Sequence, residues 1–526
     1  MSNNVIIGVN ILEILTTGMY RDSRVIFREY IQNACDQINA AVRCGLFKTA
    51  DEGEVELWID NRKRTVSIED NATGIPAAEF RETLYSIGES HKTLGEEIGF
   101  RGIGHWCGLG YCQTLKFTSK ALGEDVESVM ICNAEQMRQM MDEQNTHKAT
   151  YSVDDVLTAT VTFSQNPAKD KAAHYFKVEI IDIPDLYDEL YTLSEIKEYL
   201  SFVAPVEYDI PWRFKTQIHL HAKNLGQAIQ EHRISVNKEP IRKKYKPSFT
   251  TSKGEDAITE VDFKDFYDAD GKLIAWLWFG ISRFQGVLKQ ENAMRGIRLR
   301  MQNIQIGSDD ALQKLFKEDR GQNYFVGEVF AITRNLIPNS QRDYFNPGDA
   351  RIKFERLLSE FFNDDLSRIY KAGSTINSRF DKIQKVDKIE AEIASASVVT
   401  DEQREKLERA KREAENAANE LEKIRKKTSS SIESKNFGTY EVVVSEIFKR
   451  NEEERASRPK QEARPATPPV PKPQTVPVPD ITTAEPIPQE APDKLISLAK
   501  IKRIICELTD SSIAQKIIKR IEEDIT

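Results

Sequence analysis

The sequence predicts a multi-domain protein that mixes helices and strands (α/β, of the α+β kind), followed by coiled-coil helices, a linker and a short helical tail. The chain has 526 residues, and at about 100 to 200 residues per domain this length is enough for three or four domains. Helix-like and strand-like patterns alternate along most of the chain, heptad spacing follows, and prolines then dominate. With 40% hydrophobic and 30% charged residues, the composition excludes a wholly disordered or fibrous chain.

Charge and cysteine usage narrow the function classes. The chain carries 83 acidic and 74 basic residues, so its net charge opposes bulk attraction to nucleic acid or anionic lipid and leaves only a local basic groove open. The N-terminus has no basic leader, and no run of about 18 apolar residues occurs. The 6 cysteines form no CxxC pair, which favours a reducing compartment. We therefore expect a cytoplasmic protein without a membrane span.

The first predicted domain, residues 1–190, opens with a helix over residues 21–45, where apolar residues recur at helical spacing and Gly45 provides the stop. The segments EVELWID and TVSIED alternate apolar and polar residues around a turn at residues 61–64, which is typical of a half-buried hairpin. A glycine-rich stretch covers residues 88–110. A further helix is expected to end before Pro205, because proline disfavours helix in the residue before it.

A second α/β block is expected over residues 191–375. Its strand candidates are TQIHLHA, KLIAWLWFGISRF, GIRLRMQNIQI and YFVGEVFAI. His219 and His221 would share one strand face, but without an evident third ligand they are better explained as ordinary sheet residues than as a metal site.

The C-terminal third is predicted to be helical and then extended. A folded-back helical hairpin over residues 376–430 is favoured over one long kinked helix, because Thr400 and Gln403 have capping-box spacing. Residues 431–454 could be helix or strand. Residues 455–493 hold 11 of the 20 prolines and predict a linker. Residues 494–526 have two short apolar stripes that need a partner, for which we prefer a second copy over another subunit or the same chain.

Three groups of residues point to chemistry. Glu29, Asn33 and Asp36 lie four and three residues apart, so one helix face carries a carboxylate that can activate water and a carboxamide that can hold Mg²⁺. Asp70 closes the second hairpin strand and is followed by Gly74. A cluster of glycines with its neighbours could then let backbone N–H groups approach phosphate: Gly99, Arg101, Gly102, Ile103 and Gly104. Alone, the first group also fits a solvated helix face, and the last fits a turn.

In this order, REYIQNACD, EDNATGI and GFRGIG resemble the three nucleotide motifs of the GHKL ATPase superfamily, whose Bergerat fold is an α/β sandwich. The resemblance implies binding of ATP and Mg²⁺, with Glu29 as general base, Asn33 as the Mg²⁺ ligand and Asp70 as the adenine contact. The glycines would hinge a lid that also contains Lys92, and Asp36 and Gly74 would complete the nucleotide site. Histidine kinases of the superfamily lack the equivalent of Glu29, so its presence implies hydrolysis.

Two residues depart from the family pattern. Ala72 stands where the second motif usually has glycine. In the family, one strand carries a threonine that lines the adenine pocket. If residues 175–180 form that strand, Phe176 stands in the place of the threonine. The residue that takes over the role of the threonine then stays unassigned.

Within the superfamily, residues 10–360 most resemble the ninety-kilodalton heat-shock chaperones. The segment SEIKEYLSFVAPVEY is similar to their helix leading into a middle transducer domain, and Asn339-Ser-Gln-Arg342-Asp is similar to the segment whose arginine reaches the γ-phosphate. Arg342 would then stabilise the transition state, whereas the alternative is an ion pair with Asp343 or another acid.

These resemblances imply an ATP-driven clamp that closes around a macromolecular client. A protein client or partner subunit is preferred. A DNA clamp, similar to mismatch-repair MutL or MORC ATPases, is the main alternative, because basic runs occur at residues 242–246 and 295–300. A nucleotide-gated scaffold subunit, in a bacterial defence system for example, is the third.

Overall fold

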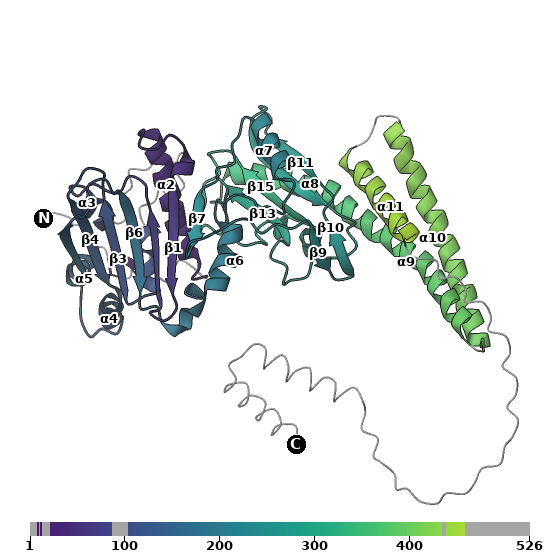
Figure 1. Cartoon of the computed structure of the whole chain (residues 1–526), viewed down its shortest axis with the longest axis horizontal. Helices are drawn as coiled ribbons and strands as arrows, with labels where there is room; N and C mark the ends of the chain where they lie inside the picture. Colours follow the sequence, from purple (N-terminus) through teal and green to yellow (C-terminus); the bar gives the residue numbers. More distant parts are fainter. Residues whose placement is uncertain are drawn as a thin grey trace, which may run out of the picture. The chain divides into compact units, whose positions relative to one another are not determined.

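The computed structural model of the chain describes residues 8–9, 11–12, 22–86, 104–396, 398–433 and 438–457. In these ranges two β-sheets with their helices are followed by long helices (Figure 1). The expected linker and tail lie outside the described residues. No described helix combines the length and the apolar character needed to cross a membrane.

The first sheet has eight strands in the part of the chain that the structure describes, in the order β5-β4-β3-β6-β2-β1-β7-β8. Neighbouring strands are antiparallel except β1 and β7, which are parallel. The strands are β1 (Glu54–Asp60), β2 (Thr65–Asp70), β3 (Thr114–Lys120), β4 (Val126–Asn133), β5 (Val161–Pro167), β6 (Tyr175–Ile181), β7 (Arg233–Val236) and β8 (Glu239–Pro240).

Strands β7 and β8 come from beyond residue 190, where the first domain was expected to end. In β7, Ile234 and Val236 are buried and pair with Val55 and Leu57 of β1. The first sheet therefore takes strands from the segment that also leads into the second sheet.

Helix α2 (Val25–Arg43) lies against β1 and β2, with its apolar side in the core of the first sheet (Figure 1). It confirms the helix expected over residues 21–45, and Gly45 follows its end with a φ of +80°. Ser152 and Asp155 form a capping box at the start of α5. The other helices in this part are α3 (Phe80–Tyr85), α4 (Ala134–Asn145), α5 (Val153–Thr160) and α6 (Leu193–Val203).

The second sheet has the order β11-β12-β15-β13-β14 and packs around an aromatic-rich core. Three of the four expected strand segments are confirmed. The strands are β11 (Glu260–Tyr267), β12 (Leu273–Ile281), β13 (Gly296–Met301), β14 (Ile304–Gln305) and β15 (Val326–Ala331), beside a separate hairpin of β9 (Ser248–Thr251) and β10 (Gly254–Ala257).

The fourth expected strand, TQIHLHA, is wrong, because this segment belongs to helix α7 (Lys215–Asn224). Its buried residues Ile218 and Ala222 are four apart and Leu220 between them is exposed, which is the spacing of a helix face. A run this short fits both periods, so the pattern could not decide. His219 and His221 pair with different acids, Glu231 and Asp265.

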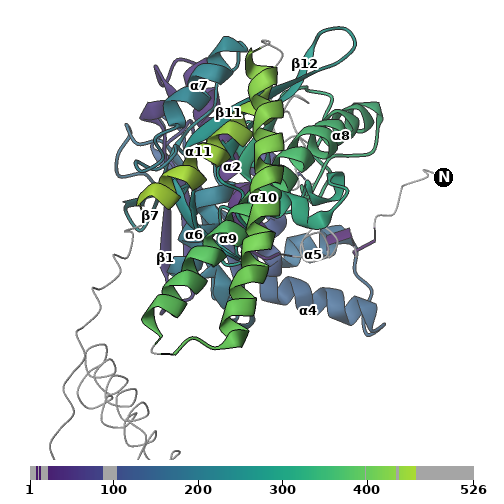
Figure 2. The ribbon, with the colours of Figure 1, turned by 90° about the vertical axis from the view of Figure 1, so that its right-hand side faces the viewer.

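The C-terminal third of the described chain is helical, with α8 (Asp349–Phe361), α9 (Ser367–Ser395), α10 (Asp401–Glu433) and α11 (Thr439–Ser457). Helices α9 and α10 run side by side (Figures 1 and 2) and are antiparallel, because Arg379 pairs with Glu420 whereas Lys411 pairs with Glu390. The segment that was left open as helix or strand is mostly α11, which folds back against α9.

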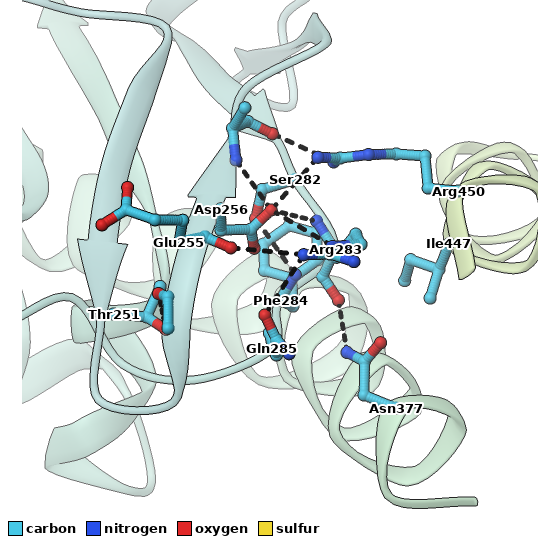
Figure 3. Close-up of polar contacts among 12 residues, drawn as sticks. Thr251, Glu255, Asp256, Ser282, Arg283, Phe284, Gln285, Asn377, Ile447 and Arg450 are labelled. Atoms are coloured by element: carbon cyan, nitrogen blue, oxygen red, sulfur yellow. Dashed lines mark hydrogen bonds and ion pairs between the residues drawn. The ribbon is translucent and has the colours of Figure 1, made fainter. Parts of the chain in front are cut away.

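A polar junction attaches α9 and α11 to the β9–β10 hairpin and the end of β12 (Figure 3). Asp256 is its centre: the carboxylate is fully buried, accepts from the backbone N–H of Arg283 at 3.2 Å and pairs with the guanidinium of Arg450 at 3.3 Å. Asn377 of α9 donates to the carbonyl of Arg283 at 2.8 Å. The helices are thus held by buried charge-assisted bonds as well as by apolar packing.

Candidate functional site

Helix α2 places its polar residues in a buried layer rather than in solvent. Glu29 is 2% exposed and Asp36 is 5% exposed, while Asn33 between them is half-buried. A solvated helix face would leave these side chains open to water, so that explanation of the spacing is excluded. A buried carboxylate destabilises the folded chain unless it is paired with a cation or hydrogen-bonded.

Arg342 brings a positive charge to Glu29. Its Nε lies 3.1 Å from Glu29 Oε1, and both side chains are almost fully buried. The alternative to a catalytic role was an ion pair with Asp343 or another acid, and the acid that Arg342 meets is the buried Glu29. Asp343 hydrogen-bonds to Asn339. Arg342 lies in the loop after β15 of the second sheet, so residues 313 positions apart in sequence meet at the first turns of α2.

A second contact holds this loop in place. Arg28 Nη2 donates to the carbonyl of Gln341 at 3.1 Å, and Arg28 Nε lies 3.9 Å from Glu29 Oε1. Sequence reasoning missed Arg28, whose only local signal is a basic residue directly before the expected general base. Two guanidinium groups therefore face one buried carboxylate.

Asp70 ends β2 as a buried carboxyl group, 3% exposed. Burial raises its pKa to about 7, and the bond that its Oδ1 accepts from Ala72 N at 3.0 Å only partly opposes that rise. A carboxylate in this setting is a strong acceptor for a ligand that brings its own donors, as the exocyclic amine of adenine does.

The loop after Asp70 accepts only glycine at Gly74. Its φ is +64°, and an added Cβ would lie 2.1 Å from the carbonyl oxygen of Lys120. Ser119, which sequence reasoning also missed, pins the next residue: its Oγ accepts from Ile75 N at 2.6 Å. These contacts fix the path of the loop beside Asp70.

The two departures from the family pattern have structural settings. The methyl group of Ala72 is fully buried in the core of the first sheet. The carbonyl of Ala72 is hydrogen-bonded to His174 Nδ1 at 2.7 Å. Residues Tyr175–Ile181 do form a strand, β6, in which Phe176 lies directly opposite Asp70. The ring of Phe176 contacts that of Phe117, so an aromatic wall takes the place expected for a hydroxyl.

Gly104 begins a 3₁₀ helix, Gly104–Gly110, close to the base: an added Cβ would stand 3.0 Å from Glu29 Oε2. Tyr30 of α2 holds this helix, donating to the carbonyl of His105 and accepting from Gly108 N, both at 3.0 Å. The other predicted lid residues lie outside the described residues: Lys92, Gly99, Arg101, Gly102 and Ile103.

The donor set fits Mg²⁺ held jointly with a nucleotide. In the described ranges no group of three His, Cys, Asp or Glu side chains could hold a metal ion. Mg²⁺ usually takes one or two protein oxygens and completes its shell with water and phosphate oxygens. The Asn33 carboxamide, half-buried one turn from Glu29, has the oxygen that such a site requires.

The basic runs that favoured DNA are partly interior: three of their seven basic side chains are buried, whereas Lys244 and Lys246 are exposed. Lys243 and Arg300 are fully buried and both pair with Glu328 of β15. Burial lowers the pKa of Lys243 to about 7, while the two cations hold the pKa of Glu328 down at about 2 despite burial. Arg298 is 6% exposed. These side chains stabilise the second sheet and are not available to a phosphate backbone.

Comparison with known proteins agrees with the geometry. Residues 27–161 match the family described as histidine kinase-, DNA gyrase B-, and HSP90-like ATPase. The chaperone protein HtpG of Nocardia farcinica is 22% identical over 282 residues, 49% of this chain and 38% of that protein. HtpG of Mycobacterium leprae is 22% identical over 302 residues (51% and 40%), and HtpG of Methylibium petroleiphilum is 28% identical over 134 residues (22% and 21%).

The chain spans less than half the length of these relatives. Glu29, Asp70 at the end of β2 and the glycines of the third motif lie within the segment that matches the ATPase family. The chain therefore carries an ATPase domain of the GHKL type, and over roughly half its length it is a distant relative of the HtpG chaperones.

Proposed function

We propose that the chain is a Mg²⁺-ATP-dependent conformational clamp that acts in the cytoplasm, in which ATP hydrolysis opens and closes the protein around a macromolecular client. The contact between Glu29 of α2 and Arg342 from the second sheet carries this proposal. It joins the proposed hydrolytic base to a residue of the domain that contains the second sheet. Binding and hydrolysis of ATP can therefore change how this domain packs against the first.

The chemistry assigns a role to each buried group. Asp70 accepts the adenine amine, and Glu29 takes a proton from water as its oxygen forms a bond to the γ-phosphorus. The bond from that phosphorus to the β–γ bridging oxygen breaks, and ADP leaves with the electron pair. Arg342 turns from Glu29 towards the γ-phosphate and stabilises the charge that develops there. Asn33 would hold Mg²⁺, which would offset negative charge on the phosphate oxygens.

Phosphate release by three proteins tests the proposal. Glu29→Ala should bind ATP and barely hydrolyse it. Arg342→Ala should lower kcat by about a hundredfold, on the order of 3 kcal/mol, without changing the ATP affinity that calorimetry measures. Arg356→Ala is the matched control, because this arginine of α8 is exposed and pairs with Glu360 four residues on in the same helix. Wild-type turnover in Arg342→Ala would remove Arg342 from the reaction.

A protein client is favoured over DNA, because three of the seven basic residues of these runs, Lys243, Arg298 and Arg300, are buried and only Lys244 and Lys246 are exposed. Retention on a DNA column distinguishes the two: a DNA clamp would bind at low salt and elute steeply as salt rises, since phosphate contacts release counterions. Binding of ATP without any hydrolysis would instead support the nucleotide-gated scaffold.

We also propose that the segment from Asp493 to Thr526 joins two copies of the chain. Tethered protomers turn closure into an intramolecular event at high effective concentration. Light scattering should give a dimer for the full chain and a monomer after deletion of this segment. Equal oligomeric states would instead indicate a different partner for the tail.

A further inference from the structure

Gln32 is a buried polar side chain of α2 that the mechanism above does not use. It is 1% exposed. Among the residues that the structure describes, neither its Oε1 nor its Nε2 has a hydrogen-bond partner. Leaving both ends of a buried carboxamide unmet destabilises the folded chain, and such groups in native proteins call for a functional explanation.

The position of Gln32 in α2 places it beside the base. Successive residues of an α-helix are about 100° apart, so residues three and four apart lie on one face. Gln32 follows Glu29 by three residues and precedes Asp36 by four, within the buried polar face that also carries Asn33. Its apolar neighbours in the chain, Ile31 and Ala34, belong instead to the core of the first sheet.

The arginines next to Glu29 cannot accept a hydrogen bond from the attacking water. Arg342 and Arg28 supply positive charge at Glu29 Oε1, and neither guanidinium can accept a hydrogen bond. A water that attacks phosphorus needs one acceptor for the proton it loses and a second partner to fix its orientation. A carboxamide can accept from that water with its oxygen and donate to a phosphate oxygen with its nitrogen.

Resting on the ATP hydrolysis proposed above, we infer that Gln32 is a positioning residue that orients the attacking water between Glu29 and the γ-phosphate. Gln32 neither gives nor takes a proton, which passes from the water to Glu29. In this role Gln32 Oε1 and Nε2 gain their hydrogen-bond partners when the water and the phosphate are bound.

The test is Gln32→Leu, which keeps the size of the side chain and removes both polar ends. We expect kcat to fall about 100-fold, the lower end of the loss when one preorganised polar group is removed, while KM and the ATP affinity from calorimetry change less than about twofold. The melting temperature should stay equal or rise, because leucine needs no partner in a buried position. Gln217→Leu, on the exposed side of α7, is the control and should change none of these values.

Two further variants separate a positioning role from a packing role. Gln32→Asn keeps the carboxamide but shortens it, so it should retain more turnover than Gln32→Leu. Gln32→Ala leaves a gap and should lower the melting temperature. Wild-type kcat in Gln32→Leu, or a loss of kcat only together with a lower melting temperature, would overturn the inference. Failure of the proposed function looks different, since wild-type protein and Glu29→Ala would then release phosphate equally slowly.

Discussion

Replacing Asp70 by asparagine is the sharpest test of the site, because it should strengthen the fold and abolish binding at once. The substitution keeps the shape of the side chain and an oxygen that can accept from Ala72 N, as Asp70 does at 3.0 Å. It removes a negative charge that is fully buried at the end of β2. Adenine then loses its charged acceptor, so ATP binding should disappear.

The size of the stability change follows from the pKa. Burial raises the pKa of Asp70 from 3.8 to about 7, so the folded chain holds this proton more tightly than the unfolded chain. Its contribution to folding is complete below pH about 4 and is lost as the pH rises through about 7. The full difference is about 4 kcal/mol. An unpaired amide N–H in the variant costs about 1 to 2 kcal/mol, which leaves a net gain of about 2 to 3 kcal/mol at pH 8.

Urea unfolding between pH 5 and pH 8.5 measures this gain, and calorimetric titration measures ATP binding. The advantage of Asp70→Asn should grow with pH and vanish near pH 5. Glu69→Gln is the control, since the neighbouring carboxylate is 43% exposed and pairs with Lys177, and its loss should change stability by less than about 1 kcal/mol. Parallel stability curves for Asp70→Asn and wild type would refute the buried, proton-binding carboxyl group.

Three further predictions concern other contacts. Glu29→Gln should keep ATP affinity and lower phosphate release at least about a hundredfold; an unchanged rate would exclude it as base. Gly104→Ala should slow turnover by about tenfold or more, because its Cβ would meet Glu29 Oε2 at 3.0 Å and displace it; steady-state kinetics would contradict this if kcat were retained. Asp256→Ala leaves the half-buried Arg283 and Arg450 without their shared acid and should destabilise the chain by about 3 kcal/mol; a melting temperature within about 1 °C of wild type would argue against the polar junction.

Local patterns predicted much of the site. The spacing of Glu29, Asn33 and Asp36 depends only on helix geometry, and Asp70 could be placed because it ends a strand with clear alternation. Gly74 was assigned from the family resemblance. The reason that glycine is needed there is a contact with another part of the chain: the carbonyl of Lys120 in β3 leaves no room for a Cβ. Gln32 carries no signal of its own in the sequence, because a glutamine within a motif has no distinctive pattern.

Long-range contacts escaped prediction for a physical reason. The bond from Arg28 to the carbonyl of Gln341 joins positions 313 residues apart, and β7 enters the first sheet through parallel pairing with β1. Periodicity reports which face of a segment is apolar and says nothing about which segment covers it. The strand predicted where helix α7 forms has the same origin, because apolar residues on one side of a seven-residue segment fit a helix and a strand equally well.

The sequence by itself determined the element types of the strongly periodic segments, the ordered nucleotide motifs and the helical character of the C-terminal third. Those features depend on neighbours within one or two turns, where backbone geometry decides. Tertiary structure alone decided that Glu29 is buried against Arg342 and that Lys243 and Arg300 of the basic runs turn inward to Glu328. Burial and charge pairing depend on which distant segments pack together, and that is a property of the whole fold.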